Sequence, residues 1–259
     1  FEISNKKIHV KDGEAESLSV RISRHGPIMN DVIEEISTED PIAMSWIYTG
    51  LNVEILDALY TISRAENMQD VKLGSSLIHA PGLNVMYGDA AGNVAWWAAG
   101  KLYKHKEHVN TKMVLDGTTG EDDPIAYLDF SENPMAENPP WNYVYSANNQ
   151  PDSIANMLYP GYYLPEDRAK RIVNLLDAKD NWNQRAAEIM INDVTSSVAL
   201  ENIEEFTRIM DYNSFSKKEQ GAIDVLQLWD GSNTIDNPAP TIYNKWIYLY
   251  LKNTFEDEM

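Results

Sequence analysis

An asparagine pair and a later arginine are the residues of this chain best suited to chemistry at a carbonyl group. Asn148 and Asn149 follow a predicted short strand over residues 143–146, and Arg168 comes twenty positions after Asn148. A side-chain amide at a strand end can donate a hydrogen bond to the oxyanion that forms when a carbonyl is attacked. A guanidinium is a rigid, permanently charged group that can hold a polar network or a substrate carboxylate in place. Each has a structural alternative: asparagine tolerates the positive φ of a turn, and Arg168 can be a solvated helix residue.

The histidines indicate structure rather than catalysis. His25 precedes Gly26-Pro27, a pair that ends a strand, so we expect a structural role and not a general base. The other histidines show no metal-ligand spacing, and the acidic residues 121–123 are typical of a solvated loop. The chain has no cysteine, which excludes disulfides, thiol catalysis and zinc held by cysteine.

The net charge of the chain limits the classes of partner that it can bind. Lysine and arginine number 21 against 40 aspartates and glutamates, which gives a formal charge of −19. A surface this acidic repels phosphate backbones and anionic lipid headgroups, so we expect no nucleic-acid partner. No apolar run of about 18 residues occurs, so no membrane span is expected either.

The first part of the chain is rich in predicted strands. Two alternating runs, 6–10 and 17–23, flank a Lys-Asp-Gly turn and predict a hairpin. A further strand is expected over 43–48. A second hairpin is expected from 84–87 and 94–98, which flank a loop containing two glycines.

Two helices are predicted between these hairpins. The first covers residues 53–64 and places Ile55, Leu59 and Ile62 on one face. The second is expected to begin after Asn67, a residue suited to an N-cap.

From residue 166 onward the pattern is helical. Ser216 and Glu219 form a capping box ahead of one of these helices. Strands with a helical interlude followed by helices indicate an α+β fold rather than regular βαβ winding. We therefore expect residues 1–150 to be mostly strand with two helices and residues 151–259 to be mostly helical.

Six phrases, in order along the chain, resemble the penicillin acylase family of N-terminal-nucleophile hydrolases. Each phrase alone is weak, but together they span residues 24 to 231. They are Arg24-His25-Gly26-Pro27-Ile28; Asn84-Val85-Met86-Tyr87-Gly88-Asp89 running into Gly92-Asn93-Val94-Ala95-Trp96 and Gly100; Asp116-Gly117-Thr118; Ser146-Ala147-Asn148-Asn149 with Asp167-Arg168-Ala169-Lys170-Arg171-Ile172; Asp193 with Ser196; and Leu228-Trp229-Asp230-Gly231.

The resemblance implies a fold and a reaction. The fold would be an N-terminal-nucleophile hydrolase sheet sandwich, to which the β-rich half contributes. The reaction would be cleavage of an acyl group from an amine by the N-terminal serine of a processed β-chain, with its own α-amine as base. That serine would lie outside this chain, whose Phe1 has no hydroxyl. The chain would then be a central part of the β-chain, inactive alone, with an α-chain and further β-chain segments as partners.

The resemblance also implies roles for individual residues. Asn148 would donate its side-chain amide to the oxyanion, and Arg168 would orient groups near the nucleophile. Arg171 is expected to make a contact between elements. Family members often bind structural calcium near the junction of their chains, and Asp152 is the candidate ligand here. A periplasmic or secreted location is implied as well.

Departures from the family pattern leave the substrate open. Met190-Ile191 stands where many members have Met-Gln, and the residues after Gly100 lack the usual proline and arginine. Penicillins, cephalosporins and acyl-homoserine lactones are all substrate classes of the family. The expected substrate is therefore an acylated amine.

A non-catalytic alternative is a glycan- or peptide-binding module. Seven tryptophans and fourteen tyrosines are compatible with stacking on sugars, and this alternative requires an exposed aromatic platform. The hydrolase interpretation requires Asn148 and Arg168 to converge on one concave surface. It also predicts uncovered sheet edges, through which a homodimer is expected.

Overall fold

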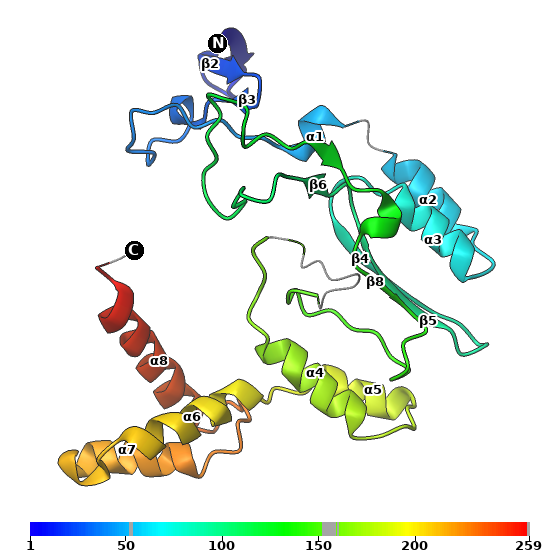
Figure 1. Ribbon diagram of the computed structural model, residues 1–259. Coiled ribbons are helices and arrows are strands. Elements are labelled where there is room, and N and C mark those ends of the chain that lie inside the picture. The colour runs from blue at the N-terminus through cyan, green and yellow to red at the C-terminus, as the bar shows by residue number, and fades with distance from the viewer. Residues whose placement is uncertain (52–53, 152–158, 160, 258–259) are drawn as a thin grey trace. The chain divides into compact units, whose positions relative to one another are not determined.

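The chain divides into two compact units, which are described here separately. The computed structural model describes residues 1–51, 54–151, 159 and 161–257. One unit contains Phe1–Val144 with Ser153–Gly161, and the other contains Tyr145–Asp152 with Tyr162–Met259. In the described residues, the named strands all lie in the first unit and the helices from α4 onward lie in the second (Figure 1).

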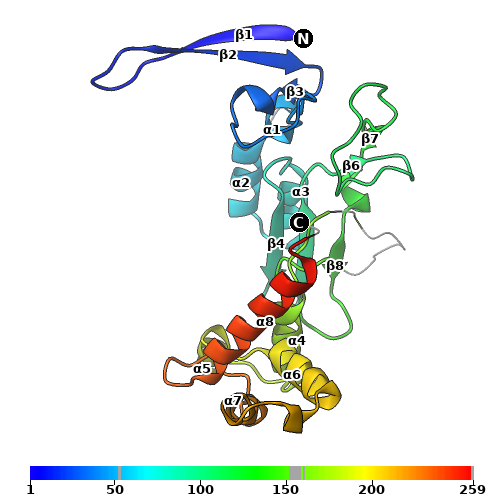
Figure 2. The same ribbon diagram turned by 90° about the vertical axis from the view of Figure 1, so that its left-hand side faces the viewer.

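The first unit begins with a long antiparallel hairpin, as predicted. Strand β1 (Glu2–Ile8) pairs along its whole length with β2 (Glu16–Ser23), with Ser4 opposite Val20, and β3 (Gly26–Pro27) extends the sheet beside β2 (Figure 2). The turn contains Asp12 at φ 60°, a conformation that aspartate tolerates better than most residues.

A second antiparallel sheet forms the centre of this unit. Strands β4 (Leu83–Gly88) and β5 (Val94–Ala99) make the predicted hairpin, and β8 (Met135–Glu137) pairs with β5. A short ladder joins β6 (Tyr103–Lys104) to β7 (Ala126–Tyr127).

The turn between β4 and β5 is held by one carboxylate. Asp89 accepts hydrogen bonds from the backbone N–H of Ala91 and Asn93, from the Asn93 side chain and from the Tyr87 hydroxyl, all at 2.8–2.9 Å. The hydrogen bonds from Asn93 contribute most to lowering the pKa of Asp89 below its ordinary value. The glycine-bearing phrase of the sequence is therefore a structural turn.

The described residues of this unit form three α-helices: α1 (Ile47–Gly50), α2 (Ile55–Ser63) and α3 (Met68–Ser76). Ile55, Ala58 and Ile62 of α2 pack in the core with Ile78 and Ala99. Asn67 caps α3 as predicted, since its Oδ1 accepts from the N–H groups of residues 69 and 70. Single-turn 3-10 helices lie at η1 (Met29–Asp31) and η2 (Phe130–Glu132).

Three local predictions are wrong. The stretch 43–48 is not a strand, because it makes one β-bridge at Ala43 and then turns into α1. Leu59 is 53% exposed, because the inward stripe of α2 passes through Ala58 instead. Residues 143–146 belong to no strand in the described structure.

The second unit is helical. Its helices are α4 (Asp167–Asp177), α5 (Gln184–Ile191), α6 (Ser197–Ile209), α7 (Lys217–Gln227) and α8 (Ala239–Phe255), with a 3-10 turn at η3 (Tyr212–Ser214). The predicted capping box opens α7: the Ser216 hydroxyl accepts from the Glu219 N–H, and the Glu219 carboxylate accepts from the Ser216 N–H.

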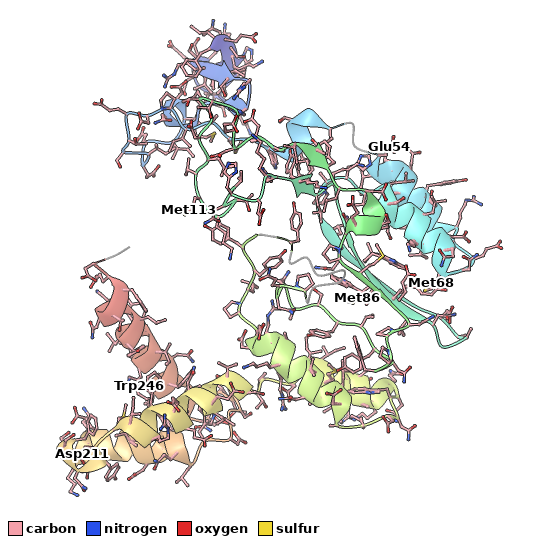
Figure 3. The ribbon with its side chains drawn as sticks, viewed as in Figure 1. Glu54, Met68, Met86, Met113, Asp211 and Trp246 are labelled. Atoms are coloured by element: carbon pink, nitrogen blue, oxygen red, sulfur yellow. The ribbon has the colours of Figure 1, made fainter. Side chains whose placement is uncertain are left out.

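The core of this unit lies between α6, α7 and α8. Ile203, Leu226 and Trp229 are buried there, and Trp246 of α8 packs against them. The ring centroids of Phe206 and Trp246 lie 4.8 Å apart. Trp246 is labelled on α8 in Figure 3. No helix in the described residues is long and apolar enough to cross a membrane.

Candidate functional site

The Asn148 turn is fixed by contacts to its backbone. Asn148 has φ 60°, the left-handed conformation that asparagine tolerates. Its carbonyl oxygen accepts a hydrogen bond from the Leu164 N–H at 2.8 Å. The N–H of Ala147, which is buried, donates to Asn149 Oδ1 at 3.2 Å. The turn expected of an asparagine pair is present, and Asn149 is committed to stabilising it.

Arg168 binds this turn from the start of α4. Its Nη2 donates to the carbonyl oxygen of Ala147 at 2.6 Å and to Oδ1 of Asn148 at 2.8 Å. Arg168 lies in the first turn of the helix, next to the buried Ala169. The structure therefore brings the two sequence-predicted residues into direct contact across twenty positions of chain.

The guanidinium also decides which way the Asn148 amide points. Arginine carries only hydrogen-bond donors, so the Asn148 atom that faces Arg168 must be the oxygen. The side-chain nitrogen, Nδ2, is then directed away from Arg168 with both of its N–H groups available. Within the described residues, Nδ2 donates to no acceptor. An oriented amide donor without a protein partner is what stabilisation of an oxyanion requires.

A second arginine ties α4 to the segment that precedes α6. Arg171 Nε donates to Asp193 Oδ1 at 2.8 Å, and its Nη2 bonds the other carboxylate oxygen. The Thr195 N–H also donates to Asp193 Oδ1, at 3.1 Å. Paired two-point contacts of this kind fix geometry as well as charge. Arg171 thus makes the expected contact between elements.

The last two family-like phrases meet beside this ion pair. The Ser196 N–H donates to the Gly231 carbonyl oxygen at 2.9 Å. Gly231 has φ 83°, and a Cβ atom there would lie 2.7 Å from the Ser196 carbonyl oxygen. Only glycine fits this conformation and this approach, so the glycine of the Trp-Asp-Gly phrase closes the contact between α7 and the start of α6.

The Arg171–Asp193 pair makes a testable contribution to stability. Hydrogen bonds from Arg171, with Thr195 adding to them, hold the pKa of Asp193 below its ordinary value. The unfolded pKa is about 3.9, so this stabilisation is fully present above about pH 4 and is lost as the pH falls through the lower folded-state pKa. Asp193→Asn is expected to lower the free energy of unfolding by about 1–3 kcal/mol at neutral pH.

Chemical unfolding from neutral to acidic pH measures this difference. The difference in the free energy of unfolding between the wild type and Asp193→Asn should become smaller as the pH falls. Asp236→Asn is the matched control, since Asp236 is exposed and makes no ion pair or hydrogen bond with the described residues. A gap that stays constant with pH would show that the ionised carboxylate is not the source of the effect.

Arg168 also borders a groove between α4 and α5. The groove has a volume of about 420 Å³, which is in the range of small-molecule sites. Its walls combine apolar side chains, such as Ile172 and Leu175 of α4 with Met190 of α5, with charged and polar residues that include Arg171 and Asp193. Arg168 therefore borders a concave surface and contacts the Asn148 turn, but Asn148 is not among the residues that line this groove.

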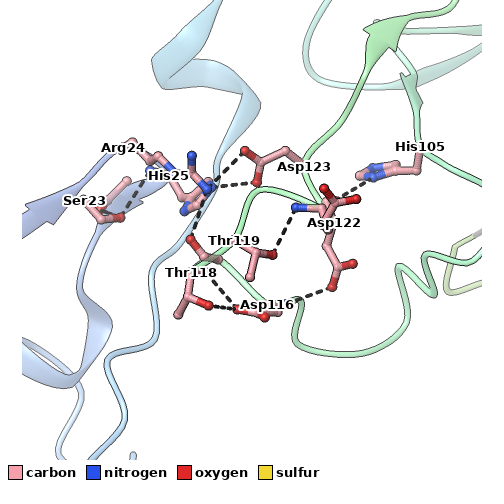
Figure 4. A network of polar contacts seen from close by, with 12 residues as sticks. Ser23, Arg24, His25, His105, Asp116, Thr118, Thr119, Asp122 and Asp123 are labelled. Atoms are coloured by element: carbon pink, nitrogen blue, oxygen red, sulfur yellow. Dashed lines mark hydrogen bonds and ion pairs between the residues drawn. The ribbon is translucent and has the colours of Figure 1, made fainter.

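His25 takes part in a polar network in the first unit. Its Nε2 lies 2.8 Å from Oδ1 of Asp123, and Nη2 of Arg24 lies 3.4 Å from the other oxygen of that carboxylate (Figure 4). Arg24 also donates to the carbonyl oxygen of Gly117, at 3.1 Å. This network joins the His-Gly-Pro phrase to the Asp-Gly-Thr loop, as expected for a structural histidine.

The predicted calcium ligand cannot be placed. Asp152 lies outside the described residues. Elsewhere in the described part of the chain, no three His, Asp or Glu side chains form a set that could hold a metal ion. The described residues therefore supply no donor set for calcium, and no chemical step is assigned to it.

Two contacts of the site were beyond sequence reasoning. The carbonyl oxygen of Ala147 and the N–H of Leu164 fix the turn, yet neither side chain carries a chemical signal.

The exposed aromatic pair required by the alternative function is also present. Trp46 and Tyr48 are 52% and 40% exposed with ring centroids 5.0 Å apart, but their planes are tilted by 52°.

Comparison with known proteins gives a consistent result. A model of the penicillin amidase family matches residues 1–259. Acyl-homoserine lactone acylase QuiP of Pseudomonas fluorescens strain Pf-5 is 24% identical over 196 residues, covering 74% of this chain and 24% of that protein. Its counterpart from Pseudomonas syringae pv. tomato is 26% identical over 226 residues, covering 86% of this chain and 26% of that protein. The chain thus spans about a quarter of these relatives.

The solved structures give the same fold. Thermostable penicillin G acylase from Alcaligenes faecalis superposes with a TM-score of 0.75 at 19% identity, over 97% of this chain and 46% of that one. The α+β class and the family expected from the sequence are therefore confirmed.

Proposed function

Since this chain belongs to the penicillin amidase family, we propose that it forms part of a hydrolase that releases an acyl group from an amine. The proposed substrate is an acylated amine of the penicillin, cephalosporin or acyl-homoserine lactone type. The names of the relatives support the penicillin and acyl-homoserine lactone types. A periplasmic or secreted location is proposed with it, as is structural calcium in the whole enzyme.

The observation that carries the proposal is the contact between Arg168 Nη2 and Asn148 Oδ1, at 2.8 Å. In the proposed reaction, a serine hydroxyl attacks the amide carbonyl and transfers its proton to the α-amine of the same residue. The carbonyl oxygen becomes negatively charged, and Asn148 Nδ2 donates a hydrogen bond to it. Arg168 is a positioning residue, because it acts through the orientation of Asn148.

The nucleophile is proposed to lie outside residues 1–259. The chemistry requires a hydroxyl and a free α-amine on one residue, and in this family that residue arises by cleavage of a precursor. The chain would accordingly work with an α-chain and with further segments of the same β-chain. Alone, it is expected to be inactive.

Mass spectrometry of the purified full-length protein tests the proposal. Intact-mass and N-terminal peptide measurements should find a chain that begins with serine or threonine upstream of Phe1. The same sample should hydrolyse at least one member of a panel of penicillins, cephalosporins and acyl-homoserine lactones. A precursor that is never cleaved, together with no hydrolysis across the panel, would contradict the proposal.

The exposed Trp46–Tyr48 pair is the observation that favours a binding module instead. A sugar ring stacks on a flat aromatic face, and the 52° tilt between these rings gives no common plane. The hydrolase is therefore the better-supported function. Glycan binding that is lost on Trp46→Ala, in a protein without amidase activity, would reverse that preference.

A further inference from the structure

Helix α4 carries Arg168 in its first turn, and that turn has no side-chain cap. Glu166 is the N-cap residue, and its side chain accepts no capping hydrogen bond from the helix in the described structure. The first N–H groups of a helix have no partner within it, so a helix start without a cap frays easily. The position of Arg168 therefore depends on the contacts that α4 makes with other segments.

The ion pair between Arg171 and Asp193 is the strongest polar contact of this kind among the described residues. Arg171 lies one turn after Arg168, and residues three apart share a helix face. The side chains of Arg171 and Asp193 are 28% and 18% exposed, and both carboxylate oxygens accept from the guanidinium. The ion pair between Lys170 and Glu201 is made by side chains that are 44% and 59% exposed, and such exposed pairs contribute little.

Asp193 is itself held by two other segments. Its N–H donates to the carbonyl oxygen of Met190 in α5 at 3.1 Å, and its Oδ1 accepts from the Thr195 N–H at 3.1 Å. Thr195 forms a β-bridge with Ser232, which follows α7 in the chain. The carboxylate therefore lies at a point that is anchored from two sides, and Arg171 ties α4 to it.

We propose that Asp193 is a positioning residue of the oxyanion site. Through Arg171 it sets the start of α4, and with it the distance from Arg168 to the Asn148 turn. Arg168 Nη2 makes both contacts with this turn, at 2.6 and 2.8 Å, so a displacement of the helix start changes both together. This inference rests on the proposed function, in which Asn148 Nδ2 is the donor to the oxyanion.

A purely structural role for Asp193 has a different consequence. The loss of an ion pair between elements lowers the stability of the protein and the amount of folded enzyme, whichever residue stands at position 168. A positioning role acts through Arg168, so the effect of changing Asp193 disappears once Arg168 has been replaced. Coupling to Arg168 therefore separates the two roles.

Steady-state kinetics of the full-length protein, well below its unfolding temperature, measures this coupling. Asp193→Asn keeps an oxygen for the Thr195 N–H but turns a donor toward Arg171, which carries only donors. It should lower kcat about tenfold, part of the loss expected when a catalytic group is misplaced, and leave KM within about twofold. In the background of Arg168→Met, the same substitution should change kcat by less than about twofold.

Glu201→Gln is the matched control, because it removes the exposed partner of Lys170 on the same helix. It should leave kcat unchanged. Crystal structures of the full-length variants give a second measurement that requires no activity. The distance from Arg168 Nη2 to Asn148 Oδ1 should exceed about 3.5 Å in the Asp193→Asn variant, beyond hydrogen-bond range. In the Glu201→Gln variant this hydrogen bond should remain.

An active enzyme in which Asp193→Asn keeps the wild-type kcat, or lowers it equally with and without Arg168, would overturn the inference. So would a crystal structure of the Asp193→Asn variant in which Arg168 still contacts Asn148 at the wild-type distance. A wild-type protein that hydrolyses no substrate of the panel contradicts the proposed function instead. The crystal structures then decide by themselves whether Asp193 positions Arg168.

Discussion

Asn148→Gly in the full-length protein is expected to lower kcat for amide hydrolysis by about 10²–10³-fold, the usual cost of removing one oxyanion donor. Glycine is the informative replacement because Asn148 has φ 60°, a conformation that glycine adopts without strain. The protein should therefore fold normally, and the loss should be seen in kcat. Steady-state hydrolysis of the best substrate in the panel measures it.

Asn148→Asp separates the donor from the contact with Arg168. Aspartate keeps an oxygen toward the guanidinium, 2.8 Å away in the wild type, but it has no side-chain N–H to offer. Its kcat should fall at least as far as that of Asn148→Gly. Asn149→Ala is the control for disturbing the turn itself. Asn149 accepts a hydrogen bond from Ala147 within the turn but is not the proposed oxyanion donor. An Asn148→Asp enzyme with near wild-type kcat would rule out the donor role.

Arg168→Met is expected to lower kcat by up to about 10²-fold, the scale of a misplaced catalytic group. Methionine keeps a similar length but removes the hydrogen bonds to Ala147 and Asn148, so the amide of Asn148 loses its orientation. Because Nη2 makes both contacts, Arg168→Lys should recover part of the activity. The double variant Asn148→Gly/Arg168→Met should be little slower than Asn148→Gly alone, since coupled residues are not additive.

Substrate charge distinguishes positioning from direct binding by Arg168. If the guanidinium acts through Asn148, Arg168→Met lowers kcat for carboxylate-bearing penicillins and for uncharged acyl-homoserine lactones alike. If it holds a substrate carboxylate instead, KM rises for the penicillins alone and kcat is preserved. The second result would contradict the positioning role.

The contact between Asn148 and Arg168 shows how far sequence reasoning reached at the site. The residue types and their order indicated both candidates, and their resemblance to a family suggested their roles. The orientation of the Asn148 amide was not predictable, because it depends on which of its side-chain atoms contacts the guanidinium of Arg168 on α4. The roles of the Ala147 carbonyl oxygen and the Leu164 N–H could not be predicted from the sequence either, since nearly every residue carries these backbone groups.

The sequence by itself determined the elements whose signals are local. The hairpin of β1 and β2, the cap at Asn67 and the capping box at Ser216 depend on residues a few positions apart, where propensity and spacing act directly. Only the tertiary structure decided features that need a partner from elsewhere in the chain. Residues 43–48 did not become a strand, because a strand requires a pairing partner along its length and Ala43 alone has one. The hydrogen bonds between Arg171 and Asp193 and between Ser196 and Gly231 were likewise decided by the tertiary structure. Long-range contacts are set by packing, which sequence spacing does not specify.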